Sequence, residues 1–239
     1  MSLIRSIIFN ILFLAGSLFW SIALLWVLIL PNKIALAIVG NTYVRYLNFI
    51  EKYIMGITLK IDGLENIPND GKFIIAAKHQ SAFETLNIPY MKELHYPAIV
   101  LKKSLVYIPI WGLYTIGLGH IAIDRGSATA AMRSIIRGAK RSLNNNRPFI
   151  IFPEGTRKAV GAEPNYKSGI AKIYKETNVP VIPLALNSGV VWGRNSFIKK
   201  SGVVTYKFMP AIEAGLKTSD FMQQLENIIE AETNKLTGK

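Results

Sequence analysis

A histidine and a glutamate form the pair of residues in this sequence that is best suited to acid–base chemistry. His79 precedes Glu84 by five positions and follows the apolar run 73–77. A histidine that takes up a proton near neutral pH needs a partner, usually a carboxylate, that fixes its tautomer and stabilises the imidazolium. Five residues of continuous helix turn through about 500°, which would leave the two side chains roughly 140° apart. We therefore predict that His79 lies at a strand end or in a loop and that Glu84 lies in the first turn of the next helix.

Glu84 also has a purely structural interpretation. Ser81 and Glu84 fit a capping box, in which the serine caps a helix and the glutamate reaches back to it. Such a cap contributes on the order of 1 kcal/mol to stability. A single histidine is likewise more often structural than catalytic, so the pair alone leaves both interpretations open.

Three further segments place polar residues, glycine or proline within or directly after apolar runs. They read Ile-Asp-Arg at 123–125, Phe-Pro-Glu-Gly-Thr-Arg at 152–157 and Val-Ile-Pro-Leu at 181–184. Ligands of open α/β sheets bind beyond the carboxyl ends of strands, which makes these segments candidates for a site. Each also has a bland interpretation, as a surface ion pair or a simple turn. The sequence has no GxSxG elbow and no P-loop, and its three histidines lack metal-ligand spacing, so we expect no metal.

Short apolar runs alternate with helical stretches after residue 56, which predicts an α/β fold with a mostly buried sheet flanked by helices. The expected strands cover 57–61, 73–77, 98–101, 121–123, 149–152, 181–186 and 203–208. The expected helices cover 83–93, 127–144, 168–176 and 219–236.

The N-terminal part of the chain indicates membrane attachment. Residues 7–30 carry no charge, and as a helix they would span about 36 Å, against a hydrocarbon core of about 30 Å. The uncharged stretch is longer than the apolar region of a secretory signal, which has about 7–15 residues and is followed by a small-residue cleavage site. Residues 33–55 form an amphipathic pattern that suits a helix lying on the bilayer or on the globular part. A spanning helix followed by a surface helix and a hairpin in one leaflet both remain open. We divide the chain into membrane-anchoring helices (1–55) and a second domain (56–239).

Composition restricts the chemistry further. The chain of 239 residues has no cysteine, which excludes disulfides, thiolate metal sites and a cysteine nucleophile. Its formal net charge is +13, and residues 102–207 contain 17 Lys and Arg against four Asp and Glu. This surface suits anionic partners such as phospholipid head groups, an acidic protein or nucleic acid, or it simply keeps the protein soluble.

In chain order, the His-x4-acid pair, Ile-Asp-Arg, Phe-Pro-Glu-Gly-Thr-Arg and Val-Ile-Pro-Leu resemble the glycerolipid acyltransferase family, most closely its lysophosphatidic acid acyltransferases. The resemblance covers about 56–210 and includes Lys-Lys-Ser-Leu at 102–105. It implies a mixed sheet like that of glycerol-3-phosphate acyltransferase and an N-terminal membrane-anchoring pair of helices. It also implies a catalytic domain at the cytoplasmic face of a bacterial inner membrane. The family's usual acid is aspartate; Glu84 keeps the carboxylate on a longer arm, with an altered activity as the alternative.

The resemblance implies transfer of an acyl group from acyl-carrier protein or acyl-CoA to the sn-2 hydroxyl of lysophosphatidic acid, giving phosphatidic acid, without a cofactor. His79 would be the general base and Glu84 its orienting carboxylate. The glycerol-phosphate part of the acceptor would contact Lys103, Arg125, Glu154, Gly155 and Arg157.

Other functions are compatible with parts of this pattern. A different lysolipid, such as a lysophospholipid or a lyso-ornithine lipid, would use the same motifs. A non-catalytic membrane adaptor would use only the basic face and the apolar helices. Nucleic-acid binding has only the charge in its favour, and we expect none because of the anchor and the lack of a binding motif.

Overall fold

A mixed seven-stranded sheet forms the centre of the computed structural model, which describes residues 2–124 and 126–238. Its strand order is β1-β7-β6-β2-β5-β3-β4. β7 pairs with β6 in an antiparallel ladder and with β1 in a parallel one, so β1 and β7 run antiparallel to the other strands. The strands are β1 (Ile57–Asp62), β2 (Ile74–Ala77), β3 (Ala98–Lys102), β4 (Ile121–Ile123), β5 (Phe149–Ile151), β6 (Val181–Leu186) and β7 (Gly202–Phe208). The predicted class, a mixed and mostly buried sheet flanked by helices, is confirmed.

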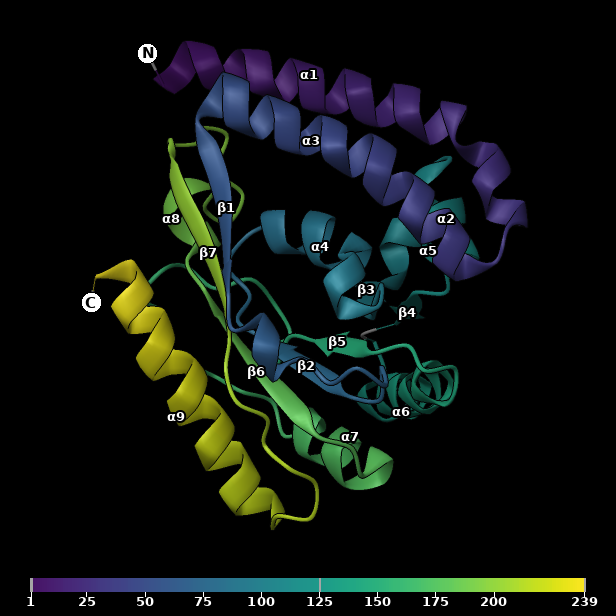
Figure 1. Ribbon diagram of the computed structural model, residues 1–239, viewed down its shortest axis with the longest axis vertical. Coiled ribbons are helices and arrows are strands. Elements are labelled where there is room, and N and C mark those ends of the chain that lie inside the picture. The colour runs from purple at the N-terminus through teal and green to yellow at the C-terminus, as the bar shows by residue number, and fades with distance from the viewer. Residues whose placement is uncertain (1, 125, 239) are drawn as a thin grey trace.

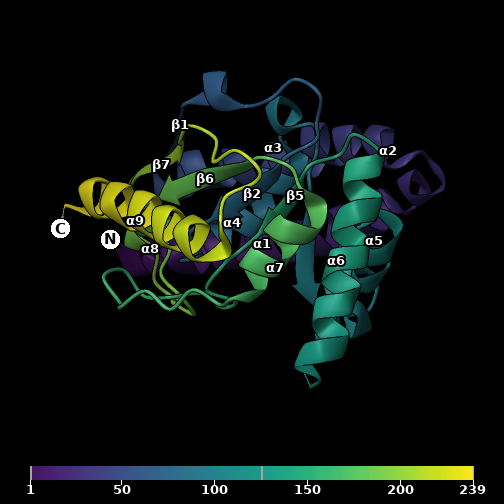
Figure 2. The ribbon, with the colours of Figure 1, turned by 90° about the horizontal axis from the view of Figure 1, so that it is seen from below.

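Helices cover both faces of this sheet, which explains why every residue of β2 is buried. Ile75 and Ala77 face a core shared with the N-terminal helices and α4 (Phe83–Asn87). The alternate residues of β2 face a second core. That core is closed by α6 (Ala128–Asn144), α7 (Gly169–Thr177) and α9 (Thr218–Thr237). α6 lies next to α7, and α7 lies next to α9 (Figure 2).

Shorter elements connect these layers. They are α5 (Trp111–Gly117), α8 (Ser188–Val191) and 3-10 turns at Leu25–Ile29, Leu64–Asn66, Ile88–Tyr90, Lys92–Leu94 and Lys103–Tyr107. The expected helix 83–93 is therefore broken into α4 and two 3-10 turns, because Pro89 cannot continue a regular helix.

The N-terminal segments form two long helical stretches that lie side by side across the top of the molecule (Figure 1). Tyr46 donates its hydroxyl to the backbone oxygen of Leu12 at 2.8 Å, and the hydroxyls of Ser17 and Tyr43 lie 2.8 Å apart. A side chain at Gly16 would overlap the Tyr46 ring, so glycine permits this close approach. The first stretch is α1 (Ser2–Ala23), and the second comprises α2 (Asn32–Val39), α3 (Arg45–Ile50) and π-helical turns at Gly40–Val44 and Glu51–Met55.

The expected membrane-anchoring pair of helices is wrong in one respect. Within the described part of the chain, only α1 is long and apolar enough to cross a membrane, with 22 residues and a mean hydropathy of 1.9 over its most apolar 18-residue stretch. It ends at Ala23 and not near residue 30. The second stretch buries Leu36, Leu47 and Ile50 in the protein core. Its apolar face is therefore covered by protein, which leaves one candidate membrane helix.

Candidate active site

The structure brings His79 and Glu84 into contact in the way that their spacing predicts. β2 ends at Ala77, α4 begins at Phe83, and His79 lies in the loop between them. Its Nδ1 lies 3.0 Å from Glu84 Oε1. The longer side chain of glutamate therefore still reaches the imidazole, although aspartate is usual at this position in the family that the sequence resembles.

Glu84 is held by three further donors in a fully buried position. Its Oε1 accepts hydrogen bonds from the backbone N–H groups of Gln80 at 2.8 Å and Ser81 at 2.6 Å. Its Oε2 accepts one from the Ser188 hydroxyl at 2.7 Å. These donors compensate a charge that burial alone would disfavour. The capping contact and the histidine contact thus coexist on one carboxylate.

The segment after β5 fixes the position of His79. The ring of Phe152 stacks on the imidazole, with centroids 3.9 Å apart and an 18° angle between the planes. The backbone N–H of His79 donates to Glu154 Oε2 at 3.0 Å, and the backbone N–H of Lys158 donates to the His79 carbonyl at 2.8 Å. β2 and β5 are parallel neighbours, so their carboxyl ends deliver both segments to one place. With Nδ1 directed at Glu84, Nε2 is the ring nitrogen left to receive a proton.

Glu154 lies behind His79 in a buried ion pair. Lys78 Nζ lies 2.9 Å from Glu154 Oε1 and 2.6 Å from Glu230 Oε1. Tyr166 donates its hydroxyl to Glu230 at 2.9 Å, and burial, followed by the Glu230 charge, raises the pKa of Tyr166. We expected Glu154 to contact a substrate. Both of its oxygens are instead used within the protein, where they orient the backbone of His79.

We expect Glu154→Ala to lower stability substantially, because it leaves the Lys78 ammonium and the His79 N–H without their shared partner. Breaking a buried pair costs about 3–5 kcal/mol, and the remaining Glu230 contact places this change near the lower limit. Chemical denaturation of the purified chain measures the difference. Glu163→Ala, at an exposed position, is the matched control. Equal stability of both variants would contradict the structural role of the Lys78–Glu154 pair.

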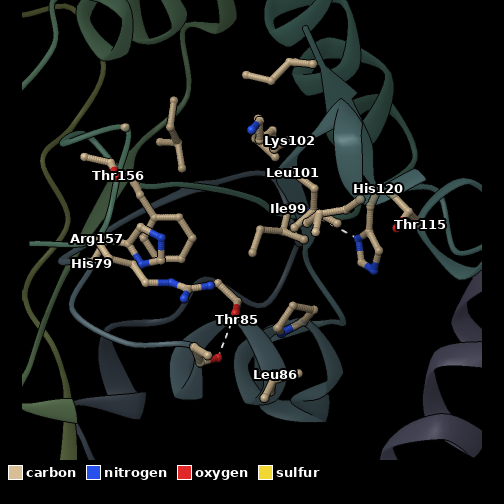
Figure 3. A pocket seen from close by; sticks show the side chains of 18 of the residues that line it. His79, Thr85, Leu86, Ile99, Leu101, Lys102, Thr115, His120, Thr156 and Arg157 are labelled. Carbon is tan, nitrogen blue, oxygen red and sulfur yellow. Dashed lines mark hydrogen bonds between the residues drawn. The ribbon is translucent and has the colours of Figure 1, made fainter. Parts of the chain in front are cut away.

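A cavity of about 630 Å³ opens beside His79. Figure 3 shows His79, Thr156 and Arg157 on one side of it, with Ile99, Leu101 and His120 on the other. Its cationic lining comes from Lys102, Arg157, Lys167 and Arg194. Its apolar lining includes residues of the N-terminal helices, namely Phe13, Trp20, Leu24, Val39 and Tyr43. The volume is in the range of small-molecule sites, and the lining suits an anionic group joined to an apolar chain.

The expected substrate-binding residues are placed differently from one another. Gly155 and Arg157 line the cavity, and Gly155 has a φ of +67°, a left-handed conformation that glycine adopts without strain. Lys103 is exposed, with its Nζ 3.9 Å from Asp124 Oδ2, and it is Lys102 that lines the cavity. Arg125 lies outside the described residues.

Several residues of the site were missed by sequence reasoning. Ser188 and Arg194 follow β6, so the rule that sites gather beyond the carboxyl ends of strands had already pointed to this region. Phe152 begins the segment 152–157 that we singled out, and Lys78 directly precedes His79, but neither was assigned a role. Nothing in their types distinguishes them from ordinary core and surface residues.

The second histidine at the cavity has a different environment. His120 Nδ1 accepts a hydrogen bond from the Ile99 N–H at 3.4 Å. Burial lowers the pKa of His120 to about 3, and Arg147 adds to the shift. It therefore stays neutral, which suits a structural role.

Comparisons with known proteins agree with this geometry. A family model described as Acyltransferase matches residues 58–187, more than half of the chain. A 1-acyl-sn-glycerol-3-phosphate acyltransferase of Pseudomonas aeruginosa is 30% identical over 213 residues, which are 88% of this chain and 81% of that protein. The protein of the same name from Limnanthes douglasii is 28% identical over 82% of this chain and 69% of its own length.

The fold has a close structural counterpart. The crystal structure of the 1-acyl-sn-glycerophosphate (LPA) acyltransferase from Thermotoga maritima aligns with a TM-score of 0.81 at 22% sequence identity. The alignment covers 100% of this chain and 99% of that one. Together with the family model and the bacterial relative, this places the sequence motifs on a known scaffold. The chain belongs to the acyltransferase family.

Proposed function

We propose that this protein transfers an acyl group from a thioester to the sn-2 hydroxyl of lysophosphatidic acid, forming phosphatidic acid in phospholipid biosynthesis. The observation that carries the proposal is the His79–Glu84 pair at a cavity lined by both cationic and apolar side chains. The relatives' names supply the acceptor, since they act on 1-acyl-sn-glycerol 3-phosphate.

The pair supplies general-base catalysis without a protein nucleophile. Nε2 of His79 takes the proton of the acceptor hydroxyl while the oxygen forms a bond to the thioester carbonyl carbon. Glu84 holds the Nδ1–H tautomer and stabilises the imidazolium. The tetrahedral intermediate collapses with cleavage of the carbon–sulfur bond, and His79 returns the proton to the leaving thiolate. Such base catalysis contributes about 10²–10⁴ in rate.

Arg157 and Gly155 are the described residues best placed to hold the acceptor phosphate. Arginine offers a planar pair of N–H donors that matches phosphate oxygens, and glycine lets a ligand approach the backbone closely. Glu154 acts through the backbone of His79. By family resemblance, Arg125 and Lys103 contribute further positive charge for the acceptor. The apolar wall accommodates acyl chains.

Residues 1–55 attach the protein to a membrane in this proposal, with α1 as the apolar helix. Exposed apolar side chains along α1 support this function, among them Ile4, Ile11, Leu14, Leu18 and Phe19. Residues 56–239 form the catalytic domain, which we place at the cytoplasmic face of a bacterial inner membrane, where acyl thioesters are available. Acyl-carrier protein and acyl-CoA are both suitable donors.

A panel of acceptors tests the substrate assignment. We expect the wild type to acylate lysophosphatidic acid faster than lysophosphatidylcholine or lyso-ornithine lipid. Arg157→Ala should raise the KM for lysophosphatidic acid about 10- to 100-fold, the loss expected for hydrogen bonds to a charged group. It should change the KM for the phosphate-free ornithine lipid little. Arg133→Ala, an exposed arginine of α6, is the control. Preference for a phosphate-free acceptor would make this protein an acyltransferase for another lysolipid.

A further inference from the structure

The loop that follows α8 contributes a second arginine to the cavity. Arg194 lines the same cavity as Arg157 and lies beyond residue 187, where the match to the family model ends. Among residues 2–124 and 126–238, neither guanidinium forms an ion pair with a carboxylate. Arg147 differs, because it donates hydrogen bonds to the backbone oxygens of Tyr96, Pro97 and Leu118. Arg147 is thus satisfied by the protein, whereas Arg157 and Arg194 remain available to an anion.

The start of α8 is in direct contact with the catalytic segment. Ser188 donates to Glu84 Oε2 at 2.7 Å, and the Gly189 N–H donates to Gln80 Oε1 at 3.1 Å. A side chain at Gly189 would meet both Gln80 and Val160, each 2.9 Å from the added carbon. The segment that carries Arg157 and the helix that leads to Arg194 therefore both border His79–Gln80. The two arginines come from separate parts of the chain, and both line the cavity that opens beside His79.

The loop itself is closed and held by α1. The Lys200 N–H donates to the Val191 carbonyl at 2.8 Å, which joins the two ends of the loop. Lys199 Nζ donates to Asn10 Oδ1 of α1 at 2.6 Å and lies 5.1 Å from the centre of the Trp192 ring. The backbone N–H of Lys199 donates to the Ser6 hydroxyl at 2.9 Å. Arg194 therefore projects from a loop whose base is fixed on both sides.

We propose that Arg194 binds the phosphate of the lysolipid acceptor together with Arg157. This inference rests on the proposed function and adds a substrate-binding residue to it. Only a short glycerol link separates the reacting hydroxyl of the acceptor from its phosphate. When that hydroxyl lies at His79, the phosphate can therefore contact only cations that lie close to His79. A phosphate monoester carries about −1.5 to −2 charges at pH 7. Two guanidinium groups match this charge better than one, and each offers a bidentate contact.

The test compares Arg194→Ala and Arg194→Lys with the wild type, using the full chain in phospholipid vesicles. Arg194→Ala should raise the KM for lysophosphatidic acid about 10- to 100-fold and leave the KM for the acyl donor unchanged. Arg194→Lys should recover part of the loss, because it restores the charge without the planar fork. Lys200→Ala removes an exposed cation of the same loop that does not line the cavity, and it should behave as the wild type.

Equilibrium binding of lysophosphatidic acid without donor provides a second measurement, in which Arg194→Ala should weaken binding by the same factor. An unchanged KM and an unchanged Kd in a normally folded Arg194→Ala variant would overturn the proposal. A raised KM for the donor alone would also overturn it, by assigning Arg194 to a phosphate of the donor. Failure of the proposed function is distinguishable, since the wild type itself would then transfer no acyl group to lysophosphatidic acid.

Discussion

His79→Ala is expected to lower kcat by about 10²–10⁴ while the protein stays folded. The variant removes the group that takes the proton of the acceptor hydroxyl. Its structural cost is small, because Glu84 keeps the hydrogen bonds from Gln80, Ser81 and Ser188. Loss of the stacking on Phe152 removes about 0.5–1.5 kcal/mol. Steady-state kinetics with a labelled thioester, together with thermal unfolding, measure both effects.

A matched control for this variant is His95→Asn. His95 has a φ of +54°, a conformation that asparagine tolerates, and it does not line the cavity. We expect its kcat to equal that of the wild type. A His79→Ala variant with wild-type kcat would contradict the catalytic assignment and would favour a membrane adaptor that uses only the basic surface and α1.

Glu84→Gln is expected to lower kcat at least about 100-fold with little change in stability. The amide oxygen can still accept from the N–H groups of Gln80 and Ser81, and the amide NH₂ can donate to the Ser188 hydroxyl. The negative charge that stabilises the His79 imidazolium is lost. The variant thus keeps the cap at the start of α4 and removes the electrostatic part of the pair, and kcat and the unfolding midpoint report the two parts separately.

Glu84→Ala provides the comparison for this experiment. It leaves two buried N–H groups and the Ser188 hydroxyl without an acceptor, at about 1–3 kcal/mol for each unsatisfied group. We therefore expect the alanine variant to be inactive and unstable, and the glutamine variant to be inactive and stable. Full activity of Glu84→Gln would return Glu84 to a purely structural role.

The strands were predictable because short apolar runs bounded by turn residues can form few other structures. The expected run 98–101 became β3, and 181–186 became β6 without change. The order of the strands was not predictable, since it depends on pairings between distant segments such as β1 with β7. The short helices α5 and α8 were missed because they hold too few residues for a helical period to be visible.

The N-terminal region shows a different limit of the sequence. The uncharged stretch 7–30 gives no signal for the end of α1 at Ala23, because neither glycine nor proline stands there. The amphipathic pattern of 33–55 was correct. A pattern of this kind does not reveal whether lipid or protein covers the apolar face, and here the protein core covers it.

The meeting of His79 and Glu84 was predictable from their spacing, because only five positions separate them. The groups that support the pair come from far along the chain. Ser188 is 104 positions from Glu84, and Glu154 is 75 positions from His79. Contacts over such separations are set by the sheet order, so the sequence suggested the region of the site without its supporting contacts.

The most direct test of the central claim is the product that the wild-type protein forms in vesicles from a labelled acyl thioester and lysophosphatidic acid. The His79–Glu84 geometry and the cationic cavity predict labelled phosphatidic acid with the label at the sn-2 position. Absence of labelled phosphatidic acid from a folded, membrane-bound preparation supplied with both donor types would contradict the assignment of this protein as a lysophosphatidic acid acyltransferase.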